Sequence, residues 1–218
     1  MTADLTYPNT FQVRQDGNAY VPTGKSLDIE SGGSLKIAGT AVTASAAQLN
    51  TLVGPTLATG AGAGITDGTG TIYKNSVRLM GNIYRTDILI DLTGLASSTT
   101  DLDIIGVGSS AAYIAKLTAA ECGTTILAIR MTCLELPAGG ADDIDLYSAT
   151  EGTGVFDAGI GTLTETALIT AGGAWANGTV KAATTAPLST EYLYLTGGEA
   201  GTAATYTAGK FLIEIFGY

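Results

Sequence analysis

The chain has 218 residues, a formal net charge of −10 and a hydrophobic content of 45%. This hydrophobic content excludes a generally disordered chain, and the length suffices for one domain with an appendage or for two small domains. Histidine is absent from the sequence, which excludes Ser-His-Asp and Cys-His catalytic arrangements and histidine ligation of zinc.

The negative charge is confined to the C-terminal part. Residues 1–80 carry five Lys/Arg and five acids, whereas residues 81–218 carry five Lys/Arg and fifteen acids. A neutral N-terminal region can dock on another protein without strong repulsion, and an acidic C-terminal part disfavours DNA and anionic membranes. No apolar run approaches the roughly 18 residues of a membrane span. We therefore expect no nucleic-acid or membrane partner, although an ordinary acidic domain explains the charge equally well.

Residues 1–22 have scattered apolar residues and no sustained period, and we interpret them as an N-terminal arm. Such a segment either becomes ordered on a partner or is a flexible tail. We favour a partner, so the sequence predicts that the large apolar side chains of the arm contact another protein: Tyr7, Phe11, Val13 and Tyr20.

Residues 23–54 contain a short repeat. The tetrapeptide S-L-D-I at 26–29 returns as S-L-K-I at 34–37, with the turn signal S-G-G between the two copies. Each copy alternates apolar and polar residues, which predicts a strand. Two such short strands cannot bury their aliphatic side chains alone. Three copies of the chain around one axis would bury them together: Leu27, Ile29, Leu35 and Ile37.

A short helix is predicted to follow this repeat. Ser45 and Gln48 form a capping-box pattern, and the Gly54-Pro55 pair is a stop signal that predicts its end. Two to three helical turns are not stable alone in water. We therefore expect the apolar side chains of this region to join the same three-chain interface, with Val42, Leu49 and Leu52 as its members. Residues 23–54 would then form a trimerising stalk.

Residues 55–70 are rich in glycine and are predicted to be a linker. The run Gly60–Gly64 is not a dinucleotide fingerprint, because it lacks the third spaced glycine and no strand-to-helix unit surrounds it.

Residues 71–218 show one short strand pattern after another, separated by Gly/Thr/Ser/Ala turns, with no long helix pattern. This predicts a mainly β head, a β-sandwich of jelly-roll type. The last two patterns are predicted to form a final pair of strands. The candidates are 71–79, 84–92, 101–107, 112–117, 125–136, 143–147, 163–170, 191–195 and 210–216.

Candidate chemistry in the head is sparse. Asp142, Asp143 and Asp145 cluster, and Glu151 and Asp157 follow. Two carboxylates can hydrolyse a glycosidic bond and several can bind calcium. However, the spacing of a calcium loop is absent from the sequence, and carboxylates on loops and strand edges are usually solvated. We expect no catalytic residue, no metal site and no cofactor.

Two cysteines and one tryptophan complete the candidates. Cys122 and Cys133 are too few for a disulfide scaffold, so we expect two reduced, buried thiols. Trp175 lies in a turn-rich loop, where it could stack on a sugar or cover an edge of the core. We favour the core.

One segment carries a resemblance to a known class of proteins. Residues 35–54 read L-K-I-A-G-T-A-V-T-A-S-A-A-Q-L-N-T-L-V-G. This run resembles a segment of tailed-bacteriophage structural proteins in which a strand is followed by V-T-A-S/T-A-A-E/Q-L-N-x-L-x-G. Gln48 stands where Glu is frequent, a conservative change in a helix cap. The resemblance implies the stalk or base of a trimeric head fibre, a capsid decoration (cement) protein or a tail fibre.

Together these patterns lead us to expect a homotrimeric structural protein on the outer surface of a phage capsid. The arm would contact the major capsid protein, the stalk would join three copies, and the head would face outward. Residues 1–5 lack the features of a signal peptide, so we expect synthesis in the host cytoplasm. The alternatives are a tail fibre or spike that binds a host receptor, for which the chain is short, and a depolymerase, against which the lack of catalytic motifs argues.

The stalk hypothesis predicts that replacing Leu27, Ile29, Leu35 and Ile37 with Ser dissociates the trimer, because the apolar side chains that three chains would bury together are removed. Sedimentation velocity measures the outcome. Replacing the polar residues Asp28 and Lys36 of the same repeats with Ser is the control, which should leave the trimer intact. A quadruple variant that still sediments as a trimer would show that the head alone trimerises.

Overall fold

A computed structural model describes residue 57, residues 59–200 and residues 202–218 in full, together with the backbone of four two-residue strands nearer the N-terminus. Two of these, β1 (Gln12–Val13) and β2 (Ala19–Tyr20), pair antiparallel, as do β3 (Lys36–Ile37) and β4 (Thr40–Ala41). Contacts divide the chain into two units, residues 1–49 and 50–218. The predicted boundaries at residues 22 and 54 lie outside the described residues. We call the described part of the second unit the head.

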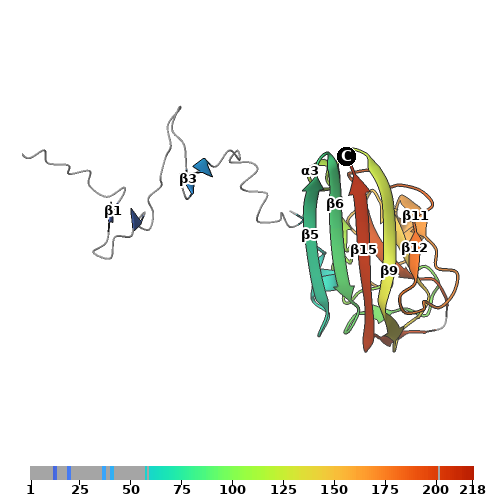
Figure 1. Ribbon diagram of the computed structural model, residues 1–218. Coiled ribbons are helices and arrows are strands. Elements are labelled where there is room, and N and C mark those ends of the chain that lie inside the picture. Colours follow the sequence, from blue (N-terminus) through green and yellow to red (C-terminus); the bar gives the residue numbers. More distant parts are fainter. Residues whose placement is uncertain are drawn as a thin grey trace, which may run out of the picture. The chain divides into compact units, whose positions relative to one another are not determined.

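The larger sheet of the head has five antiparallel strands in the order β12-β9-β15-β6-β5 (Figure 1). The strands form where apolar residues alternate with polar ones. This alternation places the apolar side chains on one face of the sheet and the polar side chains on the other. Their bounds are β5 (Ile72–Met80), β6 (Ile83–Asp91), β9 (Ile126–Ala138), β12 (Val180–Ala182) and β15 (Ala208–Gly217).

The second sheet has four antiparallel strands in the order β11-β10-β13-β8. Two short strands, β7 (Ala96–Ser97) and β14 (Ala204–Thr205), form a separate pair. Helical segments are limited to single turns in the described residues, at α2 (Ala63–Thr66), α3 (Ala119–Cys122) and the 3-10 turn η1 (Ile160–Thr162). The strands of the second sheet are β8 (Ala115–Lys116), β10 (Ile144–Ala149), β11 (Glu165–Ile169) and β13 (Tyr192–Gly197).

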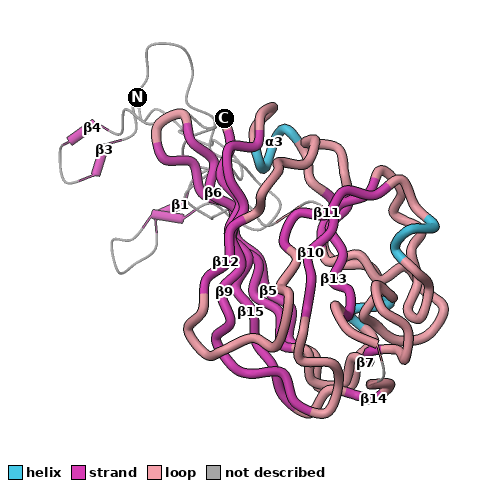
Figure 2. The backbone as a smooth tube through the Cα atoms, turned by 90° about the vertical axis from the view of Figure 1, so that its right-hand side faces the viewer, coloured by secondary structure: helices cyan, strands magenta, loops and turns pink. Residues whose placement is uncertain are grey.

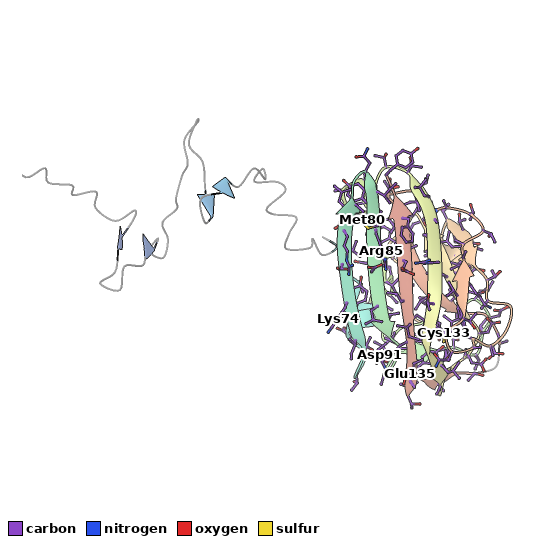
Figure 3. All side chains as sticks on the ribbon, in the orientation of Figure 1. Lys74, Met80, Arg85, Asp91, Cys133 and Glu135 are labelled. Carbon is purple, nitrogen blue, oxygen red and sulfur yellow. The ribbon has the colours of Figure 1, made fainter. Side chains whose placement is uncertain are left out.

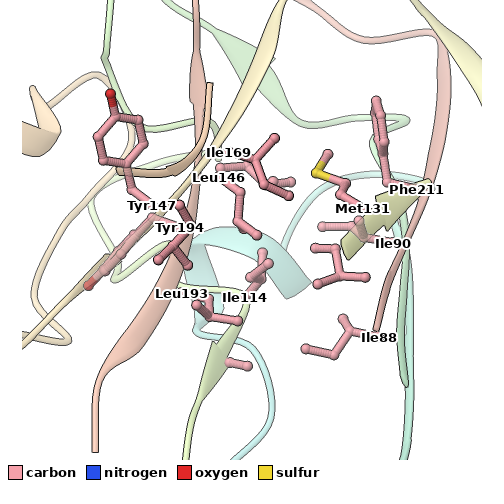
Figure 4. Close-up of a cluster of buried hydrophobic side chains, with 14 of the residues drawn as sticks. Ile88, Ile90, Ile114, Met131, Leu146, Tyr147, Ile169, Leu193, Tyr194 and Phe211 are labelled. Carbon is pink, nitrogen blue, oxygen red and sulfur yellow. The ribbon is translucent and has the colours of Figure 1, made fainter. Parts of the chain in front are cut away.

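The two sheets form layers on either side of one hydrophobic core (Figure 2). Ile213 of β15 is fully buried opposite Ile88 on β6 and Met131 on β9. From the second sheet, Leu146 and Leu193 add their side chains to the same cluster (Figure 4). The apolar face of each sheet is covered by the other sheet, since a single sheet cannot remove its apolar face from water. The head is therefore a mainly β, sandwich-like unit.

The chain crosses repeatedly between these layers. From β6 onward, and leaving the β7–β14 pair aside, each successive strand lies in the other sheet, except that β10 and β11 are neighbours in the second sheet. The only hairpin in the larger sheet among the described strands joins β5 to β6 through Gly81, whose φ of 64° suits a tight turn. Strands that are far apart in the sequence thus become neighbours in space.

The sequence predicted the long strands well. β5, β6, β9, β10, β11, β13 and β15 all fall on predicted patterns. Two predictions were wrong. The pattern at 101–107 forms only isolated bridges, and β13 and β15 do not pair, because they belong to different sheets. The sequence also missed β7, β12 and β14, which are two or three residues long and show no clear alternation.

The glycine-rich segment packs on the head. Gly62 N–H donates to the Tyr113 carbonyl at 2.9 Å, and Gly64 N–H donates to the Ala111 carbonyl at 2.8 Å. Ile65 is fully buried, and an added Cβ at Gly62 would lie 2.2 Å from the Ala111 carbonyl oxygen. The described residues between 57 and 70 were expected to be a linker, but here the small residues allow close backbone packing instead.

The core predicts a clear contrast along β9. Ile129 is 1% exposed and Leu127 is 52% exposed. We expect Ile129→Ala to lower the free energy of unfolding by about 2–5 kcal/mol, because it leaves a cavity between the sheets. Leu127→Ala, the matched control on the same strand, should change it by less than about 0.5 kcal/mol. Urea denaturation measures both, and equal losses would contradict the exposure of Leu127 at the irregular start of β9.

Candidate functional site

The interface residues predicted from the sequence lie outside the described residues. These are Leu27, Ile29, Leu35, Ile37, Val42, Leu49 and Leu52 for the trimer, and Tyr7, Phe11, Val13 and Tyr20 for the capsid. For Val13, Tyr20 and Ile37 only the strand assignment of the backbone is known. Their roles stay predictions.

The main feature of the head surface is the outer face of the five-stranded sheet, which we call the charged face (Figure 3). Strand register brings its side chains together, since directly paired residues share a face. Glu214 of β15 lies between Asp87 on β6 and Arg130 on β9, and Lys210 lies opposite Asp91. The charged residues of this face are Lys74, Arg78, Arg85, Asp87, Asp91, Arg130, Glu135, Lys210 and Glu214.

Glu214 is the centre of one ion-pair group on this face. Its carboxylate accepts hydrogen bonds from Arg130 Nε at 2.5 Å and Nη2 at 2.8 Å, and it pairs with Arg85 Nη2 at 2.7 Å. The two guanidinium carbons also lie 5.8 Å (Arg85) and 5.4 Å (Arg130) from the ring centre of Phe216. Glu214 is only 5% exposed as a result. Its hydrogen bonds with Arg130 lower its pKa, and they outweigh the opposite effect of burial.

Neighbouring acids extend these contacts along the sheet. Asp87 Oδ1 accepts a hydrogen bond from Arg85 Nε at 2.8 Å. Farther along β15, Lys210 pairs with Asp91 Oδ2 at 3.3 Å and with Glu135. Burial acts to raise the pKa of Asp91, but hydrogen bonds from Thr93 and the contact with Lys210 hold it below its usual value. The acids of this face are therefore paired with cations on the same strand or on adjacent strands.

Between the two ion-pair groups the charged face is apolar. Leu89 and Leu212 are directly paired across β6 and β15, and Leu212 is also paired with Thr132 of β9. An open depression of about 170 Å³ lies here, lined by Lys74, Asn75, Ser76, Asp87, Leu89 and Leu212. Its lining thus combines two leucines with two charged and two neutral polar residues.

The acidic cluster of the sequence is divided by the fold. Asp142 is exposed, but Asp143 and Asp145 are 5% and 4% exposed, so the expectation that these carboxylates are solvated was wrong for two of them. The reason is that β10 lies between β11 and β13 and is buried along its whole length. Burial raises the pKa of Asp145, the Ala171 N–H lowers it, and the charge of Asp143 adds to the rise.

Glu151 and Asp157 make separate hydrogen bonds. Glu151 accepts hydrogen bonds from the backbone and hydroxyl of Thr164, which lower its pKa, and Asp157 accepts one from Ser98. Across the described residues, no group of three or more His, Cys, Asp or Glu is arranged to hold a metal ion. No helix in this described part is long and apolar enough to cross a membrane.

The predictions for the thiols and the tryptophan are confirmed. Cys122 and Cys133 are free and buried. Trp175 is 4% exposed, donates its indole N–H to the Ile144 carbonyl at 2.8 Å and packs edge-on against Phe211. It closes the edge of the core and does not present a sugar-binding platform.

No family model matches the chain, and no curated protein or solved structure is significantly similar to it.

Sequence reasoning missed the charged face. A signal was present, because Arg85, Asp87 and Asp91 occupy alternate positions of one strand pattern, and Lys210 and Glu214 do the same in another. Recognising a common face also requires the order β9-β15-β6 and the register, which no local pattern supplies.

The buried carboxylate predicts a pH dependence. The folded-state pKa of Glu214 lies below its unfolded value, so its stabilising contribution is present above the unfolded pKa and is lost as the pH falls through the folded pKa. We expect Glu214→Gln to lower the free energy of unfolding at pH 7 by roughly 1.5–3 kcal/mol, because it removes charged hydrogen bonds. The loss should shrink as the pH falls below about 4.3.

Urea denaturation at several pH values provides the measurement. Glu165→Gln is the control, since Glu165 is an exposed acid on β11 without an ion pair in the described residues. A Glu214→Gln loss that is independent of pH would show that the ion pairs do not stabilise the sheet.

Proposed function

We propose that the chain is a capsid decoration (cement) protein of a tailed bacteriophage. In this proposal it acts as a homotrimer on the outer surface of the virion. It bridges neighbouring subunits of the major capsid protein and stabilises the shell without catalysis. The observation that carries the proposal is the sequence of residues 35–54, whose strand, capping box and L-N-x-L-x-G ending resemble a segment of phage structural proteins.

The strand order of the head supports this proposal. Eight strands fall into two four-stranded sets, β6-β15-β9-β12 and β8-β13-β10-β11, and β5 extends the first set. This order, with its crossings between layers, is the one expected of a jelly roll, in which two Greek keys fold onto each other. Jelly rolls occur in viral capsid proteins and also in lectins. The fold alone therefore agrees with both a decoration protein and a receptor-binding spike.

In the proposed mechanism, the arm supplies the adhesion. Burial of its apolar side chains between capsid subunits contributes roughly 25 cal/mol per Å² before entropy costs. Three arms on one trimer bind cooperatively, because binding of the first raises the effective concentration of the others. The acidic head, with its excess of negative charge after residue 80, would keep decorated particles apart in solution.

Deleting residues 1–22 tests the docking step. The shortened chain should lose binding to undecorated capsids, because the proposed contact residues Tyr7, Phe11, Val13 and Tyr20 are removed. Cosedimentation with capsids measures binding, and circular dichroism of the free protein checks that the head remains folded. Full-strength binding by the shortened chain would disprove docking through the arm.

The copy number per virion separates this function from its alternative. Decoration predicts hundreds of copies in simple ratio to the major capsid protein, because each shell has many equivalent sites. Quantitative mass spectrometry of purified virions gives the ratio. A count of a few to a few dozen copies would place the protein at the tail or the vertices, and would favour a head that binds a host receptor.

A further inference from the structure

The charged face differs from the rest of the head in its net charge. Residues 71–218 contain seven Lys/Arg and fifteen acids. Five of the seven cations and only four of the acids lie on the charged face, which gives it a net charge of +1. The remaining two cations and eleven acids give the rest of residues 71–218 a net charge of −9. The charged face thus differs in the sign of its net charge from the remainder of residues 71–218.

The carboxylates of this face are arranged so that their burial by a partner protein adds little desolvation free energy. Glu214 and Asp91 are already 5% and 6% exposed, and each is paired with cations of the same chain. The large desolvation penalty for burying a carboxylate has therefore been met within the head itself. A partner that covers this face would mainly meet its exposed cations, since the side chains of Arg78 and Arg130 are 65% and 46% exposed.

Apolar side chains complete the surface. Leu89, Leu212 and Phe216 are half-buried between the ion pairs. At the two edges, Val180 of β12 is 54% exposed and Ile72 of β5 is 46% exposed. A core of apolar residues with charged groups around it is the usual composition of a protein–protein interface.

We propose that the charged face packs against the acidic surface of the head of the next copy in a homotrimer. This inference rests on the trimer of the proposed function. In a closed three-fold ring, one patch on each copy contacts a different patch on the next copy. The excess of cations on the charged face and the excess of exposed acids elsewhere on the head favour such a contact electrostatically. The exposed acids of residues 71–218 that lie off the charged face are Asp101, Asp142, Asp157, Glu165 and Glu199.

Carbodiimide cross-linking of the full chain tests this contact, because the reagent joins Lys amines directly to carboxylates. Unlabelled and ¹⁵N-labelled protein are refolded together, so that mass spectrometry separates products between chains from products within a chain. We expect mixed-isotope products that join Lys74 or Lys210 to acids outside the charged face. The Lys210–Glu135 contact within one chain is the internal control for reaction on this face.

Two lysines off the charged face and one pair of charge-reversal variants serve as controls for the cross-linking. Lys116 and Lys181 lie off the charged face and should give no comparable product between chains. Lys74→Glu reverses an exposed charge on the face, so we expect loss of the Lys210 product between chains. Lys116→Glu, the matched reversal elsewhere, should leave that product unchanged.

The outcomes of cross-linking and sedimentation distinguish the contact between heads from the proposed decoration function. A trimer by sedimentation with the Lys210–Glu135 product, but without products between chains from the face, would overturn this inference and leave decoration intact. A monomer by sedimentation would overturn both the inference and the trimer of the proposed function. Products that join Lys74 to the major capsid protein in virions would also overturn it, and would make the charged face a capsid contact.

Discussion

The head depends on the pairing of β15 with β6 on one side and β9 on the other, because this strand joins regions that the sequence separates widely. Its inner residues Phe211, Ile213 and Ile215 are fully buried in the core. Its outer residues Lys210 and Glu214 each contact charged groups on both neighbouring strands. One strand thus organises the core on one face of the sheet and the ion pairs on the other.

The charged face follows from a constraint on that strand. A carboxylate at the centre of a sheet face is costly unless cations are near it, and the flanking strands provide Arg85 and Arg130. The same arrangement gathers most of the cations of the head on one side and leaves the other surfaces acidic. Local stabilisation of the sheet and the proposed contact between heads therefore arise from the same residues.

How much of this could be predicted from sequence depended on element length. The alternation of Phe211, Ile213 and Ile215 identified β15, and comparable patterns identified the other long strands. Short strands such as β12 carry too few residues to show a period, and the burial of Asp145 depends on the neighbours of β10. Pairing between distant strands is set by the packing of the two sheets, so β13 and β15 were wrongly paired. The predicted arm and stalk interfaces stay predictions.

The central place of β15 has a consequence for synthesis of the protein. The strand occupies residues 208–217, yet the larger sheet is interrupted between β9 and β6 until this strand arrives. During translation, the earlier strands therefore have unpaired edges and exposed apolar side chains until β15 has been synthesised. Pairing between strands that are far apart in the sequence is also slow. A chain cut short before residue 208 would lack the middle of its sheet and would be a substrate for proteases. Only chains translated past this strand could complete the larger sheet.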